Sequence, residues 1–173
     1  MYPQKNSGLL RCARNDDLGR HCFAAKSNSP CEQNDLGGDP MTPLDKLKAM
    51  KMPFAELKGV EFVEAERDRV VARMTVRPDL CTLHHTIHGG AVMALADSVG
   101  AAATVINLPE DAKGTTTLES KTNFIGGAKE GTTVIATATP IHRGRRTQVW
   151  TTRLETEDGK LVAVVTQTQL VLV

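Results

Sequence analysis

The sequence predicts an α+β protein in which a curved antiparallel sheet wraps around one long apolar helix. A run of small and apolar residues from Gly89 to about Ile106 has the composition of a helix. Two strand-like segments precede this run and four follow it in succession, an order that is typical of an α+β arrangement. Because the helix is apolar on nearly every side, it must be covered on nearly every side, and a wrapped sheet would cover it.

The segments before the helix are short. We expect a helix from Met41 to Met52 that starts at an N-cap threonine and a proline, Thr42 and Pro43. A charged turn, Glu64–Asp68, separates the first two strands, and a loop from Leu80 to Ile87 leads into the long helix. The six strands are expected at Val60–Val63, Arg69–Val76, Thr115–Phe124, Thr132–Ile141, Arg146–Thr156 and Lys160–Val173.

Residues 1–40 differ in composition from the rest of the chain. They mix Asn, Asp, Gly, Ser and Pro with scattered charges and show no apolar period. We interpret residues 1–40 as a disordered or mis-assigned N-terminal extension, with Met41 as the natural start, and residues 41–173 as the domain.

Composition excludes several classes of function. The chain of 173 residues has a formal net charge of +1, so it has no strong positive electrostatic field that would attract nucleic acid. Only 3% of its residues are aromatic, too few for a surface on which bases stack. No apolar run is suited to span a membrane, and no secretory signal is visible, so we expect a cytoplasmic protein. The cysteine spacings fit no zinc site, so we expect free thiols and no metal; the cysteines are Cys12, Cys22, Cys31 and Cys81.

Asp97 interrupts the apolar helix and is the first candidate for chemistry. A buried carboxylate costs several kcal/mol unless it is paired or protonated. No basic residue lies between Gly89 and Leu108, so a salt bridge along the helix is excluded. Asp97 is therefore either a general base or nucleophile, or a structural acid paired from another element.

The start of the long helix is the second candidate. Gly89 and Gly90 would leave backbone N–H groups unpaired at the positive end of the helix dipole. Such donors can hold a carbonyl oxygen as negative charge develops on it, although a Gly-Gly pair is also common in tight turns. His88 either positions a substrate or caps the loop.

The spacing between these two features predicts an oligomer. Gly90 and Asp97 would lie about 10 Å apart on one straight helix, too far for one carbonyl group to touch both. If both act on one bond, they come from different subunits. A two-fold dimer with two equivalent shared sites satisfies this condition.

Two further segments carry polar groups. His142, Arg143, Gly144, Arg145 and Arg146 form a cationic turn that either binds the phosphates of a nucleotide or is a solvated hairpin tip. A strand with Thr115, Thr116, Thr117 and Asn123 could orient a water molecule or a carbonyl group, although threonine is also common in strands.

The residues quoted so far resemble a known family. His88-Gly89-Gly90, followed by an acid nine residues after the histidine, resembles the hot-dog-fold acyl-CoA thioesterases, and specifically their PaaI-like branch. The segment His142–Trp150 is similar to the penultimate hairpin of that branch. The resemblance covers roughly residues 57–173.

The resemblance implies a role for each matching position. The family's acid falls on Asp97, its oxyanion donor on Gly90 with His88 beside it, and its strand helper on Thr117 or Asn123. The cationic turn His142–Arg146 falls where relatives hold the nucleotide of coenzyme A; the other expected substrate contacts are Gly89, His84 and Phe124.

Three positions depart from the family pattern. Relatives usually have Asn or Gln at the position of Thr82 and Gly at the position of His85. His84 could replace the Asn or Gln as the polar contact with the thioester. Ala101 stands where some relatives have Ser or Thr, so this helper must come from another element or be absent.

We therefore expect an acyl-CoA thioesterase that is a homodimer or a dimer of dimers (a homotetramer). Coenzyme A arrives as part of the substrate, and no cofactor is implied. Two alternatives stay open: an acyl-thioester hydratase or dehydratase with His88 and Asp97 as its acid–base pair, and a non-catalytic acyl-CoA-binding protein.

Overall fold

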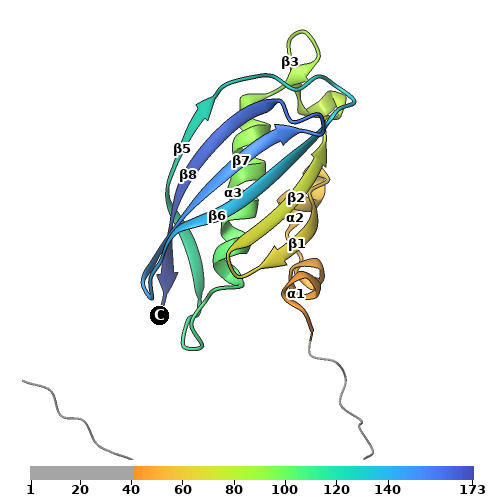
Figure 1. Cartoon of the computed structure of the whole chain (residues 1–173). Coiled ribbons are helices and arrows are strands. Elements are labelled where there is room, and N and C mark those ends of the chain that lie inside the picture. Colours follow the sequence, from red (N-terminus) through yellow and green to blue (C-terminus); the bar gives the residue numbers. More distant parts are fainter. Residues whose placement is uncertain (1–40) are drawn as a thin grey trace, which may run out of the picture. The chain divides into compact units, whose positions relative to one another are not determined.

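The computed structural model describes residues 41–173, so the interpretation of residues 1–40 lies outside the described part. Two short helices, α1 (Pro43–Ala49) and α2 (Pro53–Lys58), precede the long helix α3 (Gly89–Val105) (Figure 1). Thr42 caps α1 as expected, with a reciprocal bond to Asp45. The sequence analysis missed α2, which begins at Pro53 and ends at Gly59 in a left-handed conformation.

Six antiparallel strands form one sheet in the order β1-β2-β6-β7-β8-β5. Strand β5 is one edge and β1 the other. A second, two-stranded sheet forms the hairpin before α3. The strands are β1 (Glu61–Glu66), β2 (Arg69–Thr75), β3 (Cys81–Thr82), β4 (Thr86–Ile87), β5 (Gly114–Phe124), β6 (Thr133–Arg143), β7 (Thr147–Thr156) and β8 (Leu161–Leu172).

The predicted strands are confirmed, with two local differences. Strand β1 continues to Glu66 through a bulge after Phe62, because its charged residues alternate toward solvent; the charged turn is therefore shorter than expected. The expected loop before α3 contains the β3–β4 hairpin, which pairs Cys81 with Ile87.

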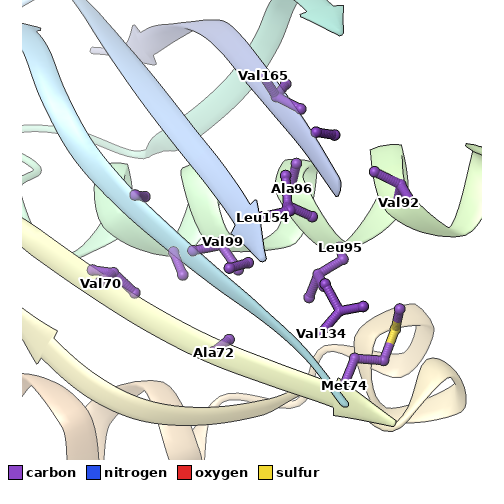
Figure 2. Packing of buried hydrophobic residues seen from close by; sticks show 14 of the residues in the cluster. Val70, Ala72, Met74, Val92, Leu95, Ala96, Val99, Val134, Leu154 and Val165 are labelled. Atoms are coloured by element: carbon purple, nitrogen blue, oxygen red, sulfur yellow. The ribbon is translucent and has the colours of Figure 1, made fainter. Parts of the chain in front are cut away.

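The hydrophobic core lies between α3 and the sheet. Helix α3 packs against β2, β5, β6, β7 and β8. Figure 2 shows Val92, Leu95, Ala96 and Val99 of α3 facing side chains of the sheet. The alternation predicted for β6 is confirmed, since its inward residues Val134, Ala136 and Ala138 are fully buried.

The sheet packs along α3 and leaves one face of this helix open within residues 41–173. Met93 is 40% exposed and Asp97 is also exposed, while Ala94, Ser98 and Ala101 are half-buried. The face of α3 that packs on the sheet carries its buried residues, large and small alike. Part of α3 is therefore open to another molecule.

No helix in the described range has both the length and the apolar character of a membrane span.

Candidate active site

Asp97 lies on the open face of α3, next to strands β5 and β8. One carboxylate oxygen, Oδ1, accepts hydrogen bonds from Thr117 Oγ1 at 3.0 Å and from Gln167 Nε2 at 2.8 Å. Within residues 41–173, Asp97 forms no ion pair. An exposed carboxylate held on one oxygen by neutral donors keeps its other oxygen, Oδ2, available for reaction.

Thr117 of β5 links Asp97 to the interior of the sheet. Its hydroxyl accepts a hydrogen bond from Gln169 Nε2 at 2.9 Å, and Gln169 Oε1 accepts one from Thr115 Oγ1 at 3.0 Å. Because the amide donates to Thr117 Oγ1, the threonine proton points toward Asp97. The structure thus brings Thr117, one of the two helper positions that the resemblance implied, into contact with Asp97; its role in the reaction stays a prediction.

Gln167 and Gln169 of β8 are two further residues of the site, and they were not among the residues expected from the sequence. Both side chains are completely buried, and Gln167 Oε1 has no hydrogen-bond partner among the described residues. A buried amide oxygen without a partner costs about 1–3 kcal/mol. The signal in the sequence was the spacing: the two glutamines lie two and four positions after the buried Val165, which places both on the inward face of β8.

A lysine on α2 approaches the same helix. Lys58 is 3% exposed, and its Nζ donates to the Ala94 carbonyl oxygen at 2.8 Å and to Ser98 Oγ at 3.3 Å. The Phe54 ring covers the ammonium group at 4.1 Å. Burial lowers the pKa of Lys58, and the charge of Asp97 acts in the opposite direction. Lys58 therefore attaches α2 to α3 without pairing directly with Asp97.

The helix start corrects the expected oxyanion donor. His88 is the N-cap of α3, and its Nδ1 accepts the N–H of Gly90 at 2.8 Å. The Gly90 N–H is therefore not unpaired, and His88 caps the helix. The Gly89 N–H has no partner in residues 41–173, so Gly89 provides the open donor at this helix end.

A cleft of about 440 Å³ adjoins this helix start. It lies between α2, the 3₁₀ turn Pro78–Leu80 and the first turns of α3. Its walls combine apolar side chains with a few polar ones: Phe54, Leu57, Lys58, Arg77, Asp79, Leu80, Cys81, His88, Gly90, Ala91 and Ala94. A cleft of this volume and lining can hold an acyl group.

Three expected substrate contacts lie around the same end of α3. Phe124 is 56% exposed at the end of β5, and a Cβ on Gly89 would lie 3.2 Å from its ring. Asn123 precedes Phe124 and is also exposed. His84 lies at the tip of the β3–β4 hairpin, with a left-handed φ of 64°. Roles in substrate binding for these side chains stay predictions.

The cationic turn His142–Arg146 lies at the other end of α3. Arg143 Nη1 donates to the Arg67 carbonyl oxygen at 2.8 Å, and Arg145 Nη2 pairs with Asp111 at 2.5 Å. Asp111 follows the C-terminus of α3, so one chain does not bring this turn to the helix start. Arg143 and Arg145 are therefore already engaged. Because these contacts are exposed, they contribute little to stability.

Within the turn, the Gly144 N–H donates to the Thr147 carbonyl oxygen at 2.9 Å. This bond closes the hairpin between β6 and β7. His142 and Arg146 are exposed beside it.

One chain also separates the helix start from Asp97. Asp97 follows Gly89 by eight positions, which corresponds to about 12 Å along α3. Gly89 and Asp97 of one chain are therefore too far apart to contact the same carbonyl group, and by more than was expected for Gly90.

A long helix packed on a curved antiparallel sheet, with an acid on its open face, is the architecture of the hot-dog fold, and comparisons with known proteins identify the class within this fold. The model of the Thioesterase superfamily matches residues 84–163. A Mycobacterium tuberculosis protein named as an esterase, Rv1847, is 32% identical over 114 residues, covering 65% of this chain and 81% of the relative. The chain therefore belongs to the thioesterase superfamily and is a thioester hydrolase.

Two further similar proteins show which branch of the superfamily this chain resembles. A 1,4-dihydroxy-2-naphthoyl-CoA hydrolase of Listeria monocytogenes is 31% identical over 116 residues, covering 65% of this chain and 90% of that protein. The structure of a point mutant of the phenylacetic acid degradation protein PaaI from Thermus thermophilus superimposes with a TM-score of 0.63 at 31% identity, covering 70% of this chain and all of that one. The resemblance to the PaaI-like branch is confirmed.

Proposed function

We propose that this protein hydrolyses acyl-CoA thioesters with Asp97 as the general base or nucleophile. The observation that carries the proposal is the exposed Asp97 carboxylate, which neutral donors hold on Oδ1 only. A relative named as a hydrolase of an aroyl-CoA supports coenzyme A as the thiol. We expect no metal or redox cofactor.

As a general base, Asp97 takes a proton from water while the hydroxyl oxygen attacks the thioester carbonyl carbon. The carbonyl oxygen becomes an oxyanion, which we assign to the Gly89 N–H at the positive end of α3. Collapse of the intermediate breaks the C–S bond, and the thiolate leaves as coenzyme A after taking up a proton. As a nucleophile, Asp97 would form an acyl anhydride that water then hydrolyses.

We propose that two chains share each site, because Gly89 and Asp97 of one chain lie too far apart to act on one carbonyl group. The open face of α3 and the unpaired edge of β5 are adjacent, and that edge exposes Leu118 (58%) and Phe124 (56%). A second copy that covers these surfaces would bring its Gly89 toward Asp97. The assembly would be a dimer or a dimer of dimers.

The substrate would extend from the cleft at the start of α3 toward the exposed surface. We assign the acyl group to the cleft of about 440 Å³ and the nucleotide phosphates to the cationic turn His142–Arg146, in which Arg146 is engaged by no other side chain of residues 41–173. Arg145 would bind phosphate by exchanging its partner Asp111.

Thiol release from saturated acyl-CoAs tests the reaction. Asp97→Asn keeps the shape and both donor contacts but removes the base, so we expect kcat to fall by several orders of magnitude with an unchanged melting temperature. Activity within threefold of the parent would refute the assignment.

The hydratase alternative needs a free basic nitrogen on His88. Because His88 Nδ1 accepts the Gly90 N–H, the neutral ring carries its proton on Nε2 and has no free lone pair. This favours hydrolysis. The non-catalytic alternative would show tight binding of acyl-CoA without thiol release across aromatic, short and long acyl groups.

A further inference from the structure

The buried amide of Gln167 contacts the reactive carboxylate from inside the protein. Gln167 lies on β8 and is completely buried, and its Nε2 lies 2.8 Å from Asp97 Oδ1 and 3.3 Å from Thr117 Oγ1. A carboxylate accepts hydrogen bonds only, so the amide must present its nitrogen, not its oxygen, to Asp97. Its oxygen is then forced to the opposite side.

Gly100 makes room for this arrangement. A Cβ at Gly100 would lie 2.4 Å from Gln167 Oε1, so any other residue would push the glutamine away from its place. Oε1 meanwhile has no hydrogen-bond partner in the described chain. A glycine inside a helix and an unpaired buried oxygen are both unfavourable for stability, so stability alone does not account for this pair of residues.

We propose that Gln167, seated against Gly100, is a positioning residue that holds Asp97 Oδ1 and thereby presents Oδ2 to the reacting groups. The inference rests on the proposed role of Asp97. Thr117 binds the same oxygen from β5, so two strands fix the carboxylate in one rotation. Without Gln167, Thr117 alone leaves the carboxylate free to turn about its contact.

A matched control is available in Gln148. Gln148 lies on β7, is 1% exposed, and also has an Oε1 without a partner among residues 41–173. Its Nε2 donates to the Asn107 carbonyl oxygen at 3.1 Å, not to Asp97. A substitution there tests the loss of a buried glutamine apart from the contact with Asp97.

The first test compares Gln167→Leu with Gln148→Leu. We expect Gln167→Leu to lower kcat by about 10- to 100-fold, the fold-change that corresponds to a hydrogen bond with a charged group, with KM within threefold and a melting temperature at or above that of the parent. Gln148→Leu should leave kcat within threefold. Equal kcat for the parent and Gln167→Leu would overturn the proposal, and so would a loss of kcat that only accompanies a loss of folding.

The second test uses charge. Gln167→Glu places a second carboxyl group beside Asp97, and two adjacent carboxylates hold a shared proton to higher pH. The acid limb of the kcat–pH profile should move to higher pH, whereas Gln148→Glu should leave it in place. The other ionisable groups on the elements around Asp97 are Lys58 of α2 and Glu119 and Lys121 of β5, since β8 has none. All three are unchanged in both variants. An unmoved limb in Gln167→Glu would refute the contact.

Gly100→Ala gives an independent check. We expect it to lower kcat as Gln167→Leu does, and to have no further effect when combined with Gln167→Ala, because both changes displace the same side chain. If the two substitutions lower kcat additively, the proposed packing of Gln167 against Gly100 is contradicted. If Asp97→Asn retains the parent's activity, the proposed function fails instead; if only Asp97→Asn is inactive and every Gln167 variant is normal, the positioning role alone fails.

Discussion

A mixture of two inactive variants should recover activity if each site is shared between two chains. One variant is Asp97→Asn, which removes the base. The other is Gly89→Pro, which removes the N–H at the first position of α3 and adds side-chain atoms near Phe124. Proline is favoured at this position, and His88, with φ −70° and ψ 138°, already has the extended backbone that a following proline requires.

The expected recovery follows from counting sites. In a one-to-one mixture of randomly paired chains, half of the dimers are mixed, and each mixed dimer has one site that receives Gly89 from one chain and Asp97 from the other, both intact. About one quarter of the parent's sites are then complete. Gly89→Pro alone should lose about 10²- to 10³-fold in kcat, the loss that is typical when one oxyanion donor is removed.

The assay is thiol release after the two variants, carrying different affinity tags, are refolded together. Gly89→Ala is the control, because it adds the same Cβ contact with Phe124, at 3.2 Å, but keeps the N–H. It should retain most of the parent's activity. If mixed dimers are isolated through both tags and yet release no more thiol than the separate variants, each site lies within one chain and the distance argument is wrong.

The other predictions concern the cationic turn, the core and metals. Arg145→Ala combined with Arg146→Ala should raise KM for acyl-CoA far more than it lowers kcat, because these arginines bind remote phosphates; an unchanged KM would exclude the turn from the site. Asp111→Asn releases Arg145 from its partner and should lower KM a few-fold, most clearly at low ionic strength, which a salt series measures. Trp150→Phe removes the bond from Nε1 to Thr104 Oγ1 at 2.9 Å in a fully buried position, so urea unfolding should show a free energy of unfolding about 2 kcal/mol lower. Dialysis against a chelator should leave kcat unchanged, and a loss restored by one metal ion would contradict the proposed chemistry.

Periodicity and composition predicted the long helix and the six strands of the main sheet. The alternation in β6 and the run of small and apolar residues in α3 are local patterns, and each is dictated by which side chains must leave water. The short helix α2 was missed because its six residues are too few for a period to be visible. The β3–β4 hairpin was missed because each of its strands has only two residues.

The sequence by itself determined the long helix, the strands around it and Asp97 as its one carboxylate, because these follow from local spacing and from the cost of burying charge. Only the tertiary structure decided how the carboxylate is held, since Thr117 and Gln167 come from strands 20 and 70 positions away in the chain. It also decided that His88 takes up the Gly90 N–H and leaves that of Gly89 open. A hydrogen bond depends on the position of a donor in space to within a few tenths of an ångström, and residue spacing along a chain does not contain that information.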